Sequence, residues 1–114
     1  MTKYGVCTIV LSLWDLYHSI AMGYSVIEDV EDRVGNTVIR RKILRTDDPQ
    51  FPSGYRYALH YGYTDGQGTI LRYDNENETP GRHERHTPDS VEAIEFPGMA
   101  ALRQRFITEV EARQ

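Results

Sequence analysis

The segment 55–63 alternates aromatic or aliphatic residues with residues of other types, and no other part of the chain restricts the fold as strongly. Every second residue is aromatic or aliphatic: Tyr55, Tyr57, Leu59, Tyr61 and Tyr63. Successive side chains of a strand point to opposite faces of a sheet, so this pattern predicts a strand with one aromatic face. The other face carries Arg56, Ala58, His60 and Gly62. An aromatic face of this kind is more typical of a core than of a platform for stacking bases, although both remain open.

Further alternating runs predict the strands of an antiparallel meander. The expected strands cover 24–34, 37–45, 55–63, 69–74 and a short segment near 91–96. Gly35-Asn36 separates the first two runs, and a Gly-Asn pair is typical of a two-residue hairpin turn because it tolerates positive φ. Asp65-Gly-Gln-Gly68 turns the chain back into the run 69–74 and gives a second hairpin. The sequence therefore predicts two hairpins and one more strand.

The C-terminal segment has the periodicity of a helix. Its apolar residues share one helical face: Met99, Leu102, Phe106 and Val110. Such a face needs an apolar surface to cover, and the aromatic side of the predicted sheet provides one. The fold class is therefore α+β, with an antiparallel sheet of about four to five strands covered by a C-terminal helix.

The first 21 residues are treated as an N-terminal extension of a single domain that covers 22–114. Asp15 and His18 interrupt their apolar run, which is too short for the ~20 residues of a membrane-spanning helix. The apolar spacing predicts an amphipathic helix, and a strand within 6–13 is the alternative. Another interpretation is a misassigned start, with translation beginning at Met22.

Charge and cysteine content exclude several classes of protein. The formal net charge is −4, so the whole chain does not attract nucleic acid or an anionic membrane, and any phosphate site must be local. The single cysteine, Cys7, excludes an internal disulfide and a cysteine-rich zinc site, which favours a cytoplasmic protein. No phosphate-binding glycine loop or dinucleotide motif occurs, so no cofactor is expected.

Chemistry-bearing residues concentrate between 72 and 86. The segment holds three arginines and two histidines: Arg72, Arg82, Arg85, His83 and His86. Histidine exchanges protons near neutral pH and arginine binds phosphate oxygens with two hydrogen bonds, so these residue types suit metal-free phosphodiester cleavage. The same segment also holds four carboxylates: Asp74, Glu76, Glu78 and Glu84. A loop stabilised by ion pairs is therefore the alternative.

A metal site is not expected at the two histidines. Pro80-Gly81 and Pro88 flank them, so a helix that would bring His83 and His86 to one face is disfavoured. In an extended segment the two side chains would point to opposite faces.

Three motifs in a fixed order resemble the TumE family. They are Tyr55-Arg-Tyr, Ile70-Leu-Arg-Tyr-Asp-Asn75 and His83-Glu-Arg-His86, followed by Glu95-Phe96 and the C-terminal apolar helix. The resemblance covers about residues 22–112. It implies the toxin of a prokaryotic toxin–antitoxin pair, with a helix-turn-helix protein as antitoxin.

Two hypotheses about function follow. In the first, the chain is a metal-independent endoribonuclease in which His83 and His86 act as base and acid, with Arg72 and Arg85 stabilising charge and Asp74 orienting a partner. Tyr73, Asn75 and Arg82 would then bind the RNA. In the second, the chain is a non-enzymatic partner of a helix-turn-helix regulator, and the same residues are structural.

Overall fold

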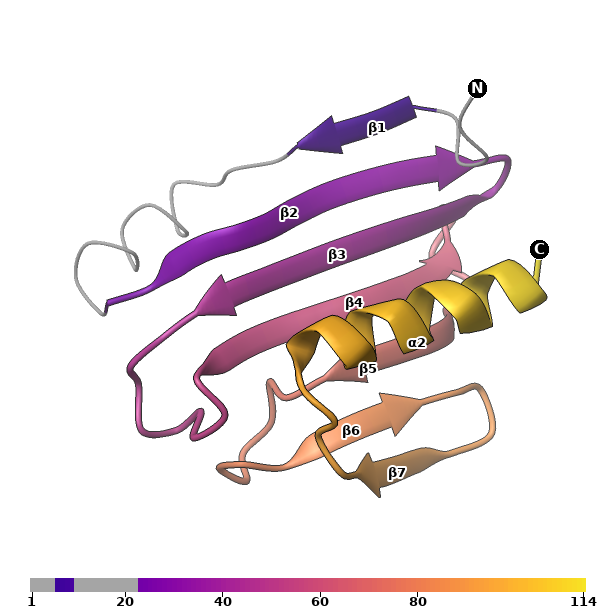
Figure 1. The fold of residues 1–114 in the computed structure, drawn as a ribbon. Coiled ribbons are helices and arrows are strands. Elements are labelled where there is room, and N and C mark those ends of the chain that lie inside the picture. Colours follow the sequence, from indigo (N-terminus) through magenta and orange to yellow (C-terminus); the bar gives the residue numbers. More distant parts are fainter. Residues whose placement is uncertain (1–5, 10–22) are drawn as a thin grey trace.

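The computed structural model describes residues 6–9 and 23–114, which form one antiparallel sheet and one helix (Figure 1). The strands lie in the sheet in the order in which they occur in the chain. Their bounds are β1 Val6–Ile9, β2 Ser25–Val34, β3 Thr37–Arg45, β4 Tyr55–Tyr63, β5 Thr69–Asp74, β6 His83–His86 and β7 Val91–Ile94. The helix, α2, covers Met99–Ala112. The predicted α+β class and antiparallel meander are confirmed.

The first predicted hairpin forms at the expected turn. Gly35 has φ of 58°, a value that the β2–β3 turn requires and that glycine adopts without a steric cost. The register then pairs Val34 with Thr37 and continues along both strands. A shift between Val26 and Glu28 marks a bulge in this ladder.

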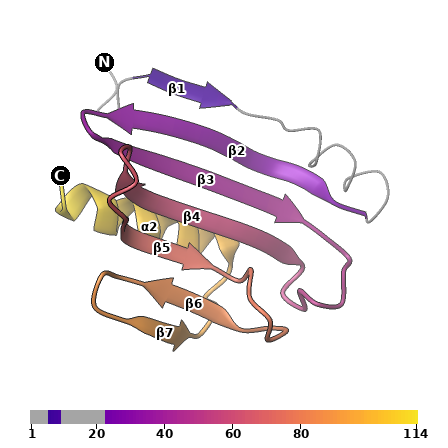
Figure 2. The same cartoon turned by 180° about the vertical axis from the view of Figure 1, so that it is seen from behind.

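Helix α2 covers one face of the sheet, and no helix of the described residues covers the other face (Figures 1 and 2). The core between α2 and the sheet contains the predicted apolar face of the helix, since Leu102 and Phe106 are fully buried. From the sheet, Tyr57, Leu59 and Tyr61 are buried in the same cluster. The aromatic face of 55–63 therefore belongs to the core, as the periodicity favoured.

The number of strands differs from the prediction. Six strands follow residue 23, where four to five were expected, and β1 makes a seventh. The additional strand is β6, whose residues His83–His86 are all polar or charged and therefore have no hydrophobic alternation. Its hydrogen bonds with β5 and β7 define it instead.

The N-terminal segment contributes backbone pairing at its start. Residues 6–9 pair with β2, in agreement with the strand alternative and not with the predicted helix over those residues. The rest of the expected helix lies outside the described residues. Within the part of the chain that the structure describes, no helix is long and apolar enough to cross a membrane.

Candidate functional site

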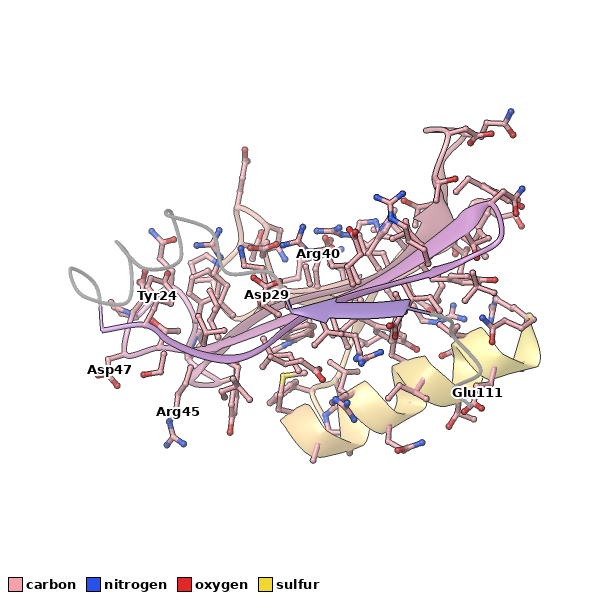
Figure 3. All side chains as sticks on the ribbon, turned by 90° about the horizontal axis from the view of Figure 1, so that it is seen from above. Tyr24, Asp29, Arg40, Arg45, Asp47 and Glu111 are labelled. Carbon is pink, nitrogen blue, oxygen red and sulfur yellow. The ribbon has the colours of Figure 1, made fainter. Side chains whose placement is uncertain are left out.

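The face of the sheet opposite α2 carries a row of basic side chains on four neighbouring strands. The register pairs Arg40 with His60, His60 with Arg72, and Arg72 with His86. Directly paired residues point to the same face, so the four side chains form one line across β3, β4, β5 and β6. We call these residues the basic row. Figure 3 shows its first member, Arg40, on the side of the sheet away from α2.

A second row runs beside the basic row and creates a hollow. Lys42 pairs with Ala58, and Ala58 pairs with Asp74. The small side chain of Ala58 leaves space above the sheet, and a hollow of about 320 Å³ lies there. Its lining is mostly basic: Arg40, Lys42, Ala58, His60, Arg72 and Glu76. We call it the central hollow.

Carboxylates hold His86 and Arg72 in place at one side of this hollow. Nε of Arg72 donates a hydrogen bond to Oδ2 of Asp74 at 2.8 Å. Nε2 of His86 lies 3.2 Å from the same oxygen and 3.5 Å from Oε1 of Glu84. These are ionic contacts without hydrogen-bond alignment, since Nε2 has no hydrogen-bond partner within the described residues. Nε2 is itself buried, so the ring would have to rotate to present this nitrogen to an added ligand.

His60 stands at the other side of Arg72, in surroundings that favour its neutral form. Burial, and next the positive charge of Arg72, lower the pKa of His60 from the ordinary histidine value. Its ring lies against Gly62, where an added Cβ would come within 2.6 Å of Nε2. Nδ1 of His60 is buried and has no hydrogen-bond partner among residues 23–114. Because Gly62 has no Cβ, the ring of His60 can lie in this position.

His83 lies on the opposite face from His86 and belongs to the core. Its ring stacks on Phe96, with centroids 4.5 Å apart, and on Tyr57 at 5.7 Å. Nδ1 of His83 is 2.8 Å from the hydroxyl of Tyr57. Burial lowers the pKa of His83. The structure thus places the two histidines of the motif on opposite faces of the sheet, as the sequence analysis predicted for an extended segment.

Arg85 and Tyr73 also face α2. Nη2 of Arg85 donates to Oε2 of Glu109 at 2.7 Å, and Tyr73 donates its hydroxyl hydrogen to the other oxygen of the same carboxylate. Burial, together with the hydrogen bond to Glu109, raises the pKa of Tyr73 to about 12. The hydrogen bond with Glu109 is also the main reason why the pKa of Arg85 is raised. This cluster attaches α2 to β5 and β6.

The last two predicted binding residues have different surroundings. Asn75 accepts a hydrogen bond from the amide of Tyr57 at 3.0 Å and donates to the carbonyl of Tyr55 at 2.7 Å. Its side chain therefore binds two backbone groups at the start of β4. Arg82 is partly exposed and donates to Glu84 at 2.7 Å. Of the eight predicted site residues, the structure therefore places Arg72, Asp74 and His86 together on the face that carries the hollow.

One group of side chains in the described residues could ligate a metal ion. Donor atoms of Asp74, Glu84 and His86 all lie within 4.8 Å of one another. Each of the two carboxylates is already neutralised by an arginine, Arg72 at 2.8 Å and Arg82 at 2.7 Å. A cation would have to replace these ion pairs, so the donor set is electrostatically unfavourable for one.

Sequence reasoning missed His60, Arg40 and Lys42 as site residues. The signal was present, because residues 56, 58, 60 and 62 were assigned to the face opposite the aromatic one. The register of β4 against β5 pairs His60 with Arg72, and residue types alone do not reveal this register.

Comparison with known proteins gives the family. The model of the family described as Toxin TumE matches residues 16–114, which is most of the chain. No match was found among curated proteins or among solved structures. The chain therefore belongs to the TumE toxin family, and this membership implies an antitoxin as its partner.

Proposed function

We propose that this toxin is a metal-independent endoribonuclease whose active site is the central hollow. The observation that carries the proposal is the basic row, in which His60 and His86 flank Arg72 on one face of three adjacent strands. Neighbouring strands are about 4.8 Å apart, so the two histidine backbones are separated by roughly 10 Å. A phosphodiester above Arg72 would have one imidazole on each side.

The reaction that fits this arrangement is transfer of the phosphoryl group to the neighbouring 2′-hydroxyl. His60 takes the proton of the 2′-hydroxyl while its oxygen forms a bond to phosphorus. The bond from phosphorus to the 5′-oxygen breaks, and His86 gives its proton to that oxygen. The products are a 2′,3′-cyclic phosphate and a free 5′-hydroxyl, and a water molecule can open the cyclic product later.

The assignment of base and acid follows from the surroundings of the two rings. Burial and Arg72 lower the pKa of His60, so this ring is neutral and ready to accept a proton. For His86 the proposed role rests on position: it stands on the other side of Arg72 from His60, with Nε2 3.2 and 3.5 Å from the carboxylates of Asp74 and Glu84. Arg72 would stabilise the charge that develops on the phosphate oxygens, and Asp74 would orient both Arg72 and His86.

A second candidate is a non-enzymatic toxin that acts by binding. The observation in its favour is that the arginines near the site are paired with carboxylates, for example Arg72 with Asp74 and Arg56 with Glu76. In this case the ion pairs only stabilise the sheet. For both candidates we propose a cytoplasmic site of action and a helix-turn-helix antitoxin.

Incubation of the purified protein with a mixed RNA pool in EDTA separates the two candidates. We expect shortened RNA with cyclic phosphate ends from the wild type. His60→Gln and His86→Gln should each lower the cleavage rate by about 10²–10⁴, with an unchanged melting temperature. Arg33→Gln, an exposed charge on β2, is the matched control and should cleave like the wild type.

Intact RNA from the wild type would reject the enzymatic proposal in favour of the binding candidate. Full cleavage by both histidine variants would reject the assigned active site.

A further inference from the structure

Strand β7 forms one edge of the sheet. It pairs with β6 on one side, and no strand of the described residues pairs with its other side (Figures 1 and 2). Its first three residues, Val91, Glu92 and Ala93, are exposed. Val91 is 57% exposed, more than any other large hydrophobic residue that the structure describes. An open edge with an exposed apolar side chain is a place where a further strand can pair.

The backbone groups of Val91 and Ala93 face outward from this edge. Thr87 and Ser90 exchange two backbone hydrogen bonds at the β6–β7 turn, so they form a hydrogen-bonded pair. Hydrogen-bonded and non-hydrogen-bonded pairs alternate along an antiparallel ladder, so the register makes Val91 and Ala93 members of non-hydrogen-bonded pairs with β6. Their N–H and C=O groups therefore point away from β6 and can bind a further strand.

The register also places Val91 in line with the basic row. Arg72 pairs with His86, and His86 pairs with Val91. On an added strand, the side chain opposite Val91 would continue this line on the same face of the sheet. The added strand would lie two strand spacings, or roughly 10 Å, from the backbone of β6. A partner bound at this edge would therefore lie next to the proposed active site.

The charges of the edge indicate the chemistry of the partner. Segment 87–98 contains three carboxylates and no basic residue: Asp89, Glu92 and Glu95. All three residues are exposed, and Glu92 contacts Arg85 at 3.3 Å. Opposite charges on facing strands stabilise their pairing. The edge therefore suits a strand that carries lysine or arginine side chains.

A second copy of the chain fits this edge poorly. The antiparallel register that uses the outward groups of both copies pairs Val91 of one copy with Ala93 of the other. Glu92 then lies directly opposite Glu92, and Asp89 lies opposite Glu95. Like charges in directly opposite positions destabilise a ladder. The edge therefore favours a different chain.

We propose that the antitoxin binds this toxin by adding a basic strand to the outer edge of β7. Family membership implies the antitoxin as a partner, and strand addition supplies the main-chain hydrogen bonds that hold it. Bound beside His86, the antitoxin would restrict access to the central hollow. The proposed edge site does not depend on the ribonuclease function, since it serves a toxin of either kind.

Calorimetric titration of the full chain with the antitoxin tests the edge site. The antitoxin used is the product of the gene next to that of the toxin whose co-expression restores growth. Ala93→Pro removes an outward N–H and leaves the ladder with β6 intact, so the affinity should fall about tenfold with little change in melting temperature. Ala93→Ser keeps the N–H, is the matched control and should bind like the wild type.

The charge of the edge is tested by the same titration. Glu92→Gln should lower the affinity for the antitoxin about threefold, because it removes one cross-strand charge pair. Glu78→Gln, an exposed carboxylate in the loop after β5, is the control and should leave the affinity unchanged.

Hydrogen exchange of the wild-type complex gives a readout that needs no variant. The amides of Val91 and Ala93 should exchange at least tenfold more slowly in the complex than in the free toxin. Wild-type affinity of a folded Ala93→Pro protein, or unchanged exchange of both amides, would overturn the inference. A toxin dimer that Ala93→Pro dissociates would assign the edge to a second copy and would also overturn it. Intact RNA in the cleavage assay would reject the nuclease alone.

Discussion

Replacement of His83 by leucine should destabilise the fold and should not act on catalysis directly. Leucine places an apolar side chain against the rings of Tyr57 and Phe96 but removes the 2.8 Å hydrogen bond to the Tyr57 hydroxyl. Tyr57 is 1% exposed, so its hydroxyl would be left without a partner, at a cost of about 1–3 kcal/mol. Loss of the ring stacking adds about 0.5–1.5 kcal/mol. The free energy of unfolding, measured in urea, should therefore fall by about 2–4 kcal/mol.

A double-mutant cycle with Tyr57→Phe checks the physical reason. When both polar partners are replaced by apolar groups, no buried hydroxyl is left unsatisfied, so the double variant should cost less than the sum of the two single changes. We expect a coupling energy of about 1–2 kcal/mol. A loss below about 0.5 kcal/mol for His83→Leu, or strict additivity in the cycle, would contradict the structural role. Loss of RNA cleavage by a His83→Leu protein of wild-type stability would restore His83 as a catalytic candidate.

Three further predictions concern stability. Phe106→Ala should lower the free energy of unfolding by about 3–5 kcal/mol in denaturant titration, because Phe106 of α2 is fully buried against the sheet, and a change below about 1 kcal/mol would contradict this packing. Asn75→Ala should cost about 2–4 kcal/mol by the same assay, because two backbone groups of β4 lose their partner, whereas Asn77→Ala in the exposed loop is the control and should cost less than about 1 kcal/mol. The melting temperature should fall as the pH drops below about 6.5, because burial lowers the pKa of His60 and His83, and the unfolded chain then binds more protons than the folded one. A melting temperature that is constant between pH 7.5 and 5.5 would disagree with this linkage.

The central strands were predictable because each of them has one consistently apolar face. In β4 the alternation of 55–63 specifies both the strand and its buried side, and Gly35 specifies the hairpin that precedes it. Strand β6 has no such signal. Its inward-facing residues are His83 and Arg85, whose burial depends on a tyrosine hydroxyl and on Glu109, that is, on partners far away in the sequence. No local pattern of hydrophobicity could have revealed them.

The candidate site was only partly predictable for a similar reason. Arg72 and Asp74 are two residues apart, so any strand places them on the same face. The position of His86 beside them depends on the register that follows the 75–82 loop, and that of His60 depends on the register of β4 against β5. The latter ladder contains an irregularity between Tyr61 and Gly62, which cannot be read from residue types.

The location of the central hollow on the face opposite α2 reconciles a net charge of −4 with a phosphate site. The overall field repels RNA, so attraction must come from groups close to the phosphate. Arg40, Lys42 and Arg72 line one hollow, and the fold keeps these cations in place with carboxylates such as Asp29 and Asp74 that lie on the same face. Because these cations have anionic neighbours, a phosphate gains less from general electrostatics than it would on a basic surface. Hydrogen bonds and stacking contacts to the ribose and base would therefore have to supply a large part of the binding energy.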